Sequence, residues 1–445
     1  MLENFSLRPY QSAQLGFHIQ QIRSLNLSSP GTGKTPTACL FINYLVRNEG
    51  VKVAFVMPKS LLKKNYSELF NFADFKEEEV AIVTGTPQKR QKIYKDPNVK
   101  VFLMGFDMFS KEWGKLPYET NGLVVDEFHM GYKTDSSART QSFYKAMRVI
   151  KWFLGMTGTL IDGRLDSAYP AIRVINPNYY MSYNSFKAIH ALYGWDGKLV
   201  GWMNHDRLAR ILSKHAVAIK FEEAYKNSPK PIIISQECEI MSQEQKKAYK
   251  EMEEMALVEL EDGYLEAHGS GGVKQLRCRQ ILEAPESVLP GFKGELGKDE
   301  ALKVHLEDAK NSGKPLLIFS VFRAEQNRLK KLCEEYGFKT ELMNGDTSDK
   351  NRARIDSEFR EGKIDIVIGS PEVMSVGFNW QHVDTVIFVS MDYKDSNFKQ
   401  AMQRADRGTR KYPLRVIRLY YGVAVEHRLW QIIKRKQEDV KKVGW

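Results

Sequence analysis

The chain has 445 residues, of which 42% are hydrophobic and 27% charged, a composition that excludes a disordered protein and allows two or three domains. There is no run of about 18 apolar residues, no signal-peptide pattern and no paired spacing among the four cysteines, so we expect no membrane span, no zinc or disulfide framework, and a cytoplasmic location. The net charge of +11 favours a polyanionic partner such as nucleic acid, although solubility alone would also explain it.

The first predicted element is a strand that runs into a glycine-rich turn, in "LNLSSPGTGKTPTACLF" (25–41). Alternating leucines predict the strand, and residues 35–47 have the pattern of a helix. Gly31 and Gly33 permit a tight turn between them, and backbone N–H groups at such a turn can face phosphates. An ordinary glycine turn is the alternative, because Ser28 stands where the phosphate-loop pattern usually has Gly or Ala.

The phosphate-loop interpretation assigns a role to each residue of the turn. The backbone of Gly31, Thr32 and Gly33 would cradle the phosphates. The Lys34 ammonium would reach the β- and γ-phosphates, and the Thr35 hydroxyl would hold Mg²⁺. The turn therefore predicts ATP and Mg²⁺ as cofactors.

Near-continuous apolar runs follow, which are typical of strands buried on both faces of a parallel sheet. In the first part of the chain they are "VKVAFVM" (51–57), "VAIVTG" (80–85), "VKVFLMG" (99–105), "GLVVDE" (122–127) and "WFLGMTG" (152–158). Residues 315–421 repeat the theme with "PLLIFS", "DIVIGS", "DTVIFVS" and "RVIRLYY". Helical patterns dominate between these two series, and 426–442 reads as an amphipathic helix. The pattern predicts an α/β fold with two lobes around a mainly helical middle region.

One of these runs ends in two acids, in "LVVDEFHMG" (123–131). Open parallel sheets bind ligands at the carboxyl ends of their strands. Asp126 is placed to hold Mg²⁺, and Glu127 to orient and deprotonate an attacking water. The alternative is a strand end with solvated acids, which the preceding phosphate loop makes a weaker interpretation. The two motifs together predict an ATPase.

The second series contains a basic helix, "QAMQRADRGTR" (400–410). Arg404 and Arg407 are spaced to share one face of it, and two guanidinium groups there could neutralise charge on the γ-phosphate. A surface basic helix is the alternative. If the arginines act on ATP bound by the first lobe, hydrolysis would open the cleft and move the lobes.

Further segments make the chain resemble a superfamily 2 helicase, in particular its Swi/Snf-type translocase branch. In the family's order they are "LRPYQ" (7–11), "FVMPKSLLKKNY" (55–66), "GMTGTLIDGRLDSAYPAIRVINP" (155–177), "SPKPIIISQECEIMSQEQKKAY" (228–249), "VKQLRCRQILEAP" (273–285), "PLLIFSVF" (315–322), "MNGDTSDKNRARIDSEF" (343–359), "IGSPEVMSVGFNW" (368–380) and "VEHRLWQIIKRKQ" (425–437). The resemblance implies two RecA-like lobes. The expected divisions are lobe 1, a helical middle region, lobe 2 and a C-terminal brace helix, at 1–165, 166–300, 301–424 and 425–445.

The resemblance also implies roles for single residues. Gln11 would read the adenine base, His129 would link to Gln400 across the cleft, and Gly377 lies where the family couples the ATP cleft to the bound strand. Contacts with the phosphate backbone of a tracked strand would come from Lys59, Ser60, Thr84, Gly85, Ser320, Gly345, Thr347 and Ser370. The chain departs from the family at Phe128, which occupies a slot that is usually small.

Three functions are compatible with this motor. The first is an ATP-dependent DNA helicase or translocase that remodels forks or branched DNA, similar to the branch-migration helicases of tailed bacteriophages and acting as a monomer. Branch migration exchanges one base pair for another at almost no net cost, whereas plain unwinding costs about 1.4 kcal/mol per step. The alternatives are a remodeller that strips proteins from DNA and, as a less favoured reading, a DExH-type RNA helicase.

Overall fold

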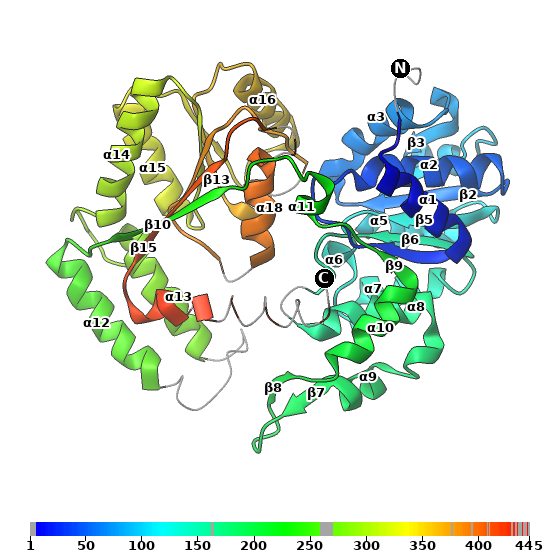
Figure 1. Ribbon diagram of the computed structural model, residues 1–445, viewed down its shortest axis with the longest axis horizontal. Coiled ribbons are helices and arrows are strands. Elements are labelled where there is room, and N and C mark those ends of the chain that lie inside the picture. The colour runs from blue at the N-terminus through cyan, green and yellow to red at the C-terminus, as the bar shows by residue number, and fades with distance from the viewer. Residues whose placement is uncertain are drawn as a thin grey trace. The chain divides into compact units, whose positions relative to one another are not determined.

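A computed structural model describes residues 6–161, 164–258, 270–374, 377–392, 395–406, 408, 410–428, 430–431, 434, 438 and 443 (Figure 1). The chain divides into two compact units. Unit 1 contains residues 1–193, 201–226 and 438–445, and unit 2 contains 194–200 and 227–437. Within the described ranges, no helix has the length and apolarity needed to cross a bilayer.

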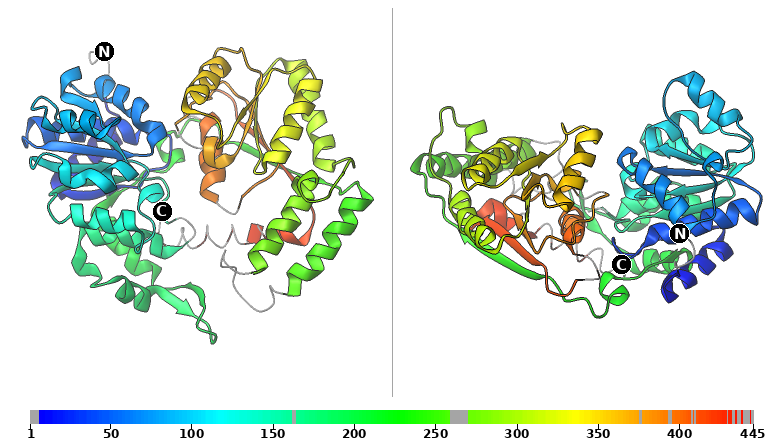
Figure 2. Two further views of the ribbon diagram at one scale, coloured as in Figure 1. Left: turned by 180° about the vertical axis from the view of Figure 1, so that it is seen from behind. Right: turned by 90° about the horizontal axis from the view of Figure 1, so that it is seen from above.

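Unit 1 is built on a parallel sheet with helices against both of its faces (Figures 1 and 2). Its strands lie in the order β3 (Val80–Ile82), β4 (Val101–Gly105), β2 (Lys52–Met57), β5 (Thr120–Val125), β6 (Trp152–Met156), β1 (Arg23–Asn26) and β9 (Ala216–Val217). Its helices are α1 (Pro9–Gln21), α2 (Lys34–Arg47), α3 (Leu62–Phe72), α4 (Pro87–Lys95), α5 (Phe106–Glu112), α6 (Phe128–Gly131), α7 (Ala138–Ala146), α8 (Tyr169–Ile175), α9 (Tyr183–His190), α10 (His205–His215) and α11 (Phe221–Ala224). A hairpin of β7 (Ala191–Tyr193) and β8 (Leu199–Trp202) lies between α9 and α10 in the chain.

Unit 2 repeats this architecture with a second parallel sheet. The strand order is β10 (Ile232–Cys238), β15 (Arg415–Tyr421), β14 (Thr385–Phe388), β11 (Leu316–Phe319), β13 (Ile366–Gly369) and β12 (Thr340–Met343). The helices are α12 (Gln243–Val258), α13 (Ser270–Glu283), α14 (Gly297–Ser312), α15 (Arg323–Glu335), α16 (Asp349–Arg360), α17 (Pro371–Met374) and α18 (Asp395–Ala405). The prediction of two parallel-sheet α/β lobes is confirmed.

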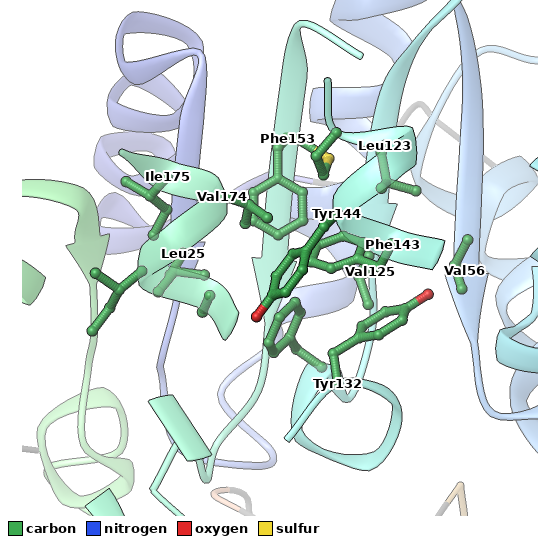
Figure 3. Close-up of a cluster of buried hydrophobic side chains, with 14 of the residues drawn as sticks. Leu25, Val56, Leu123, Val125, Tyr132, Phe143, Tyr144, Phe153, Val174 and Ile175 are labelled. Atoms are coloured by element: carbon green, nitrogen blue, oxygen red, sulfur yellow. The ribbon is translucent and has the colours of Figure 1, made fainter. Parts of the chain in front are cut away.

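The core of unit 1 includes a group of aromatic side chains beneath the sheet (Figure 3). The rings of Tyr132 and Phe143 are stacked with their centroids 4.3 Å apart. Phe128, the first residue of α6, is fully buried and contacts both rings as well as Phe153. The unusually large residue at this position therefore fills the core, and it anchors the turn that carries Asp126.

Alternate residues along the strands of unit 2 pack into two different hydrophobic clusters. Leu316 and Ile318 belong to one cluster, whereas Leu317 and Phe319 belong to the other. Side chains of successive strand residues point to opposite faces, so both faces of this sheet are covered. This explains why its strands read as continuous apolar runs rather than alternating ones.

The predicted middle region, 166–300, contributes residues to both units. Its helices were expected, but its four strands, β7 to β10, were not. The short strand β9 extends the sheet of unit 1 beside β1, and β10 forms the edge of the sheet of unit 2 beside β15. The predicted C-terminal helix, 425–445, lies largely outside the described residues.

Candidate active site

Three neighbouring strands of unit 1 bring the predicted chemistry to one edge of the sheet. The strands β5, β6 and β1 are adjacent and parallel, so their carboxyl ends lie together. The glycine-rich loop follows β1, Asp126 and Glu127 follow β5, and Thr157 follows β6. The loop and the two acids, about 90 residues apart in sequence, therefore belong to one site.

The glycine-rich loop has the backbone conformation that its glycines permit. Gly31 and Gly33 have φ angles of 80° and 83°, in the left-handed region that disfavours other residues. At Gly33 a β-carbon would also collide with the Gln11 amide nitrogen. Helix α2 begins directly at Lys34, whose ammonium donates hydrogen bonds to the carbonyl oxygens of Ser28 (2.7 Å) and Ser29 (3.3 Å).

Side chains from two distant segments hold the carbonyl oxygens of this loop. The hydroxyl of Tyr225 donates to Gly31 O (2.9 Å), that of Tyr10 donates to Thr32 O (2.6 Å), and the Gln11 amide donates to Gly33 O (3.0 Å). The C=O and N–H of a trans peptide unit point in opposite directions. Fixing the carbonyls of Thr32 and Gly33 toward the protein therefore turns the N–H groups of Gly33 and Lys34 away from it, as an anion site requires, whereas the Thr32 N–H donates to Ser29 O (3.4 Å) within the loop.

Ser28, the residue that departs from the phosphate-loop pattern, makes hydrogen bonds through its hydroxyl group. It is buried, and its hydroxyl oxygen accepts hydrogen bonds from the Gln14 amide (3.0 Å) and from the backbone N–H of Ile219 (3.2 Å). The backbone N–H of Ser29 in turn donates to Ile219 O (3.0 Å). The serine thus joins α1 and the segment after β9 to the base of the loop, which Gly or Ala could not do.

The carboxylate of Asp126 is buried beneath the site. It accepts hydrogen bonds from the Asn65 amide (3.2 Å) and from the N–H of Glu127 (3.0 Å). Burial, together with the neighbouring charge of Glu127, raises the pKa of Asp126 to about 6, against the opposing effect of the Lys34 charge. A buried carboxylate of this kind gains a compensating charge from a bound cation.

Glu127 has a strained backbone and an unsatisfied side chain. Its φ of 49° lies in the left-handed region, which a non-glycine residue adopts only where the surroundings enforce it. Among the described residues, its buried Oε2 has no hydrogen-bond partner, and it lies 3.6 Å from Nδ1 of His129. The same Nδ1 lies 2.7 Å from the hydroxyl of Thr157. A buried carboxylate oxygen is thus available to a ligand or a water molecule.

Thr157, Asn65 and Tyr225 were not identified from the sequence as site residues. Thr157 lies within the segment 155–177, whose similarity to the family pointed to the region but to no single residue. Asn65, on α3, likewise lies within a segment of family similarity, 55–66, that pointed to no single residue, whereas Tyr225 lies beyond α11 and outside every such segment. Thr35, the predicted Mg²⁺ ligand, lies in the first turn of α2.

The residues predicted to contact nucleic acid follow strands in both units. In unit 1, Lys59 and Ser60 are exposed in the short turn Lys59–Leu61 after β2, and Thr84 and Gly85 are exposed after β3. These strands end at the same edge of the sheet as the phosphate loop, because the sheet is parallel throughout.

In unit 2, the corresponding residues follow β11, β12 and β13. Gly345 is exposed, and Thr347 and Ser370 are half-buried. Ser320 differs from the prediction of a strand contact. It is fully buried and its hydroxyl donates to the buried carboxylate of Glu325, so its side chain does not face a surface.

The predicted arginine helix of unit 2 is present as α18. Gln400 and Arg404 are both buried on it, and an Arg404 guanidinium nitrogen lies 3.4 Å from Phe378 O. Gly377 has a φ of 88°, which only glycine adopts readily. Arg407 lies outside the described residues.

Comparisons with known proteins also divide the chain into two parts. The family model described as "Type III restriction enzyme, res subunit" matches residues 4–162, and "Helicase conserved C-terminal domain" matches residues 297–410. The first match lies within unit 1 and the second within unit 2, so the two parts of the chain resemble two different described domains.

Similar proteins cover nearly the whole chain. A protein of Mycoplasma pneumoniae described as an uncharacterized ATP-dependent helicase is 23% identical over 446 residues, which are 98% of this chain and 42% of that protein. A probable ATP-dependent DNA helicase of Arabidopsis thaliana, CHR12, is 26% identical over 478 residues, again 98% of this chain and 42% of the relative. The chain thus spans about two fifths of the length of these relatives. The Hef helicase domain of Pyrococcus furiosus has the same fold, with a TM-score of 0.56 at 15% identity over 96% of this chain and 98% of that one.

We expect Asp126→Asn to stabilise the ligand-free protein, and to do so only above about pH 4. The native carboxyl group, with its raised pKa, keeps its proton up to about pH 6, whereas the unfolded one loses it near pH 4. The free energy of unfolding of the wild type therefore falls as the pH rises through this window. At pH 7.5 the variant should be more stable by on the order of 2–3 kcal/mol, and at pH 3.5 it should be equal to the wild type.

Chemical denaturation at several pH values checks this expectation. Asp74→Asn, a substitution of an exposed carboxylate in the same unit, serves as the control and should change little. An Asp126→Asn variant that is less stable than the wild type at pH 7.5 would contradict the burial argument.

Proposed function

We propose that this chain is an ATP-dependent DNA helicase or translocase, which hydrolyses ATP at the carboxyl edge of the unit 1 sheet and uses the energy to remodel forked or branched DNA. The observation that carries the proposal is the phosphate loop, whose carbonyl oxygens are held by Tyr10, Gln11 and Tyr225 beside a buried pair of acids. The relatives described as ATP-dependent helicases support it.

The residues of the site fit Mg²⁺ bound together with the nucleotide. The buried carboxylate of Asp126 and the hydroxyl of Thr35 would hold the ion, which would supply neutralising charge to the phosphates. Burial and the charge of Glu127 raise the pKa of Asp126. A bound divalent ion would favour the ionised form.

Side chains of the loop and of the turn after β5 would bind the phosphates and accept the proton of the attacking water. Lys34, whose ammonium donates to the carbonyls of Ser28 and Ser29, would exchange these bonds for phosphate oxygens. Glu127 would accept a proton from the attacking water at Oε2, and its contact with His129 orients that carboxylate. Arg404 and Arg407 would neutralise charge on the transferred phosphoryl group, as the sequence predicts.

Several features support DNA as the partner. The chain has a net charge of +11, and the Arabidopsis relative is described as a DNA helicase. Lys59, Ser60, Thr84 and Gly85 are exposed after strands that end at the same edge of the unit 1 sheet as the proposed ATP site. Branched DNA suits such a motor, because branch migration needs little net energy per step.

The rate of ATP hydrolysis on a panel of nucleic acids tests the proposal. Forked DNA and four-way junctions should stimulate it more than plain duplex, single strands or RNA, and higher salt should weaken DNA binding steeply. Stimulation by RNA alone would favour the RNA helicase alternative. Displacement of a bound protein without junction migration would favour the remodeller that strips proteins from DNA.

Lys34→Ala and Glu127→Gln should both abolish turnover, for different reasons. Lys34→Ala removes a phosphate contact and should weaken ATP binding. Glu127→Gln keeps the size of the side chain but removes the proton acceptor, so it should bind ATP normally and lose roughly 10²–10⁴ in rate. Nucleotide binding and steady-state hydrolysis, measured on the same preparations, separate the two. Near wild-type turnover by Glu127→Gln would remove it from the mechanism.

Arg407→Ala should lower the maximal rate of hydrolysis by about 10³ or more while ATP binding is largely retained, as expected for a residue that acts on the transition state. Lys411→Ala, which removes an exposed positive charge close by in the sequence, is the matched control and should keep the wild-type rate. ATP binding as weak as that of Lys34→Ala would count against the assigned role.

Tyr225→Phe should raise the KM for ATP several-fold with a smaller change in kcat. The variant loses the hydrogen bond to Gly31 O, and an unpaired carbonyl lets the loop peptide rotate away from the phosphate-binding arrangement. Tyr44→Phe, which removes a tyrosine hydroxyl bonded to Glu49 on the surface of the same unit, is the control. If Tyr225→Phe only lowers the melting temperature and leaves KM unchanged, the tyrosine has a structural role alone.

A further inference from the structure

The hairpin of β7 and β8 ends in an exposed aromatic tip that the ATP site does not use. Trp195, at the turn, is fully exposed, and its neighbours Leu192 and Tyr193 are about half exposed, at 46% and 48%. The turn itself is tight, because the N–H of Gly194 donates to Lys198 O (2.8 Å) and Gly197 adopts a φ of 73°. The ribbon projects from the end of α9 (Figures 1 and 2).

The base of this hairpin is firmly anchored. His190 is fully buried, with Nε2 2.6 Å from the Tyr180 hydroxyl and Nδ1 3.0 Å from Met203 O. Burial lowers the pKa of His190, so the ring is neutral, donates from Nδ1 to the carbonyl and accepts from the tyrosine. The Asn204 amide adds a bond to Ile189 O (2.6 Å). The aromatic tip is therefore held out by a fixed support.

The two tryptophans of the hairpin have different environments. Trp202, at the end of β8, is half-buried and packs against the core of unit 1, whereas Trp195 contributes nothing to a core. A single exposed apolar residue is ordinary. Here the fully exposed tryptophan lies at the end of a ribbon on which Leu192 and Tyr193 are exposed on opposite faces, so aromatic and apolar surface is concentrated at this end of the hairpin.

Basic side chains outnumber acidic ones in the segment of the chain that contains the hairpin, residues 187–214. Lys198, Arg207, Arg210 and Lys214 are exposed, and Lys187 is half-buried. The acids among them are Asp196, which pairs with Lys198 (3.3 Å), and Asp206, which pairs with Arg210 (3.0 Å). The positive charges outnumber the negative ones, so the surface suits a ligand that offers flat apolar faces together with anionic groups.

We propose that the hairpin tip binds an unpaired stretch of DNA, with Trp195 stacked on a base and the neighbouring basic side chains on the phosphates. Unpaired nucleotides combine an accessible π-face with negative charge, which duplex DNA does not, because its bases are stacked on one another. The choice of DNA rests on the function proposed above. The exposed tip, its anchored base and the charge around it do not depend on that function.

Binding of the full chain to a labelled oligothymidylate and to a blunt duplex of equal length tests this proposal in the absence of nucleotide. Trp195→Ala should bind the single strand about 5- to 100-fold more weakly and the duplex nearly as well as the wild type. Trp195→Phe should restore most of the affinity. Tyr118→Ala, which removes an aromatic side chain that is 93% exposed and distant from the hairpin in the sequence, is the matched control and should bind both ligands normally.

Equal affinity of Trp195→Ala and the wild type for the single strand would overturn the proposal, as would an equal loss for the single strand and the duplex. Hydrolysis of ATP without DNA, measured on the same variants, should be unchanged by Trp195→Ala. A wild type that binds the single strand through Trp195 but does not hydrolyse ATP would refute the proposed function and leave the hairpin site standing. A wild type that hydrolyses ATP while Trp195→Ala binds the single strand normally would refute the hairpin site and leave the proposed function standing.

Discussion

The site in unit 1 depends on the orientation of the peptide groups in the glycine-rich loop. A glycine-rich loop can bind phosphate only if its N–H groups point outward together, and glycine by itself does not enforce this because it is so permissive. In this protein, Tyr10, Gln11 and Tyr225 each hold one carbonyl oxygen of the loop. The preorganisation of the loop is thus supplied by side chains outside it, from α1 and from the segment after α11.

The hydrophobic core fixes the turn that carries the two acids. Glu127 has a left-handed backbone, and directly after it Phe128 is buried among aromatic rings. Packing of that ring opposes any relaxation of the turn, so the backbone strain at Glu127 persists. The buried position of Asp126 also costs folding stability, which is common where charged groups are kept in place for chemistry rather than for the fold.

Much of this arrangement could be predicted from the sequence, and the exceptions have physical reasons. The apolar runs around β2, β4 and β5 marked strands buried on both faces, and Lys34 and Asp126 were placed at one edge because parallel strands share their carboxyl ends. The strand β9 has only two residues, too few for any periodic pattern. Tyr225 lies 194 residues from Gly31 in the sequence, and only the folded chain brings them together. Ser320 was predicted to contact nucleic acid, because the sequence pattern does not reveal that its hydroxyl donates a hydrogen bond to the buried carboxylate of Glu325.

The stretch from β9 to Tyr225 has a mechanical consequence. It is bonded to the loop at Ser28, Ser29 and Gly31, and it continues directly into the chain of unit 2 at Asn227. A ligand that displaces the loop therefore displaces one end of a tether, and tension applied along that tether acts on the loop before it reaches the rest of the sheet.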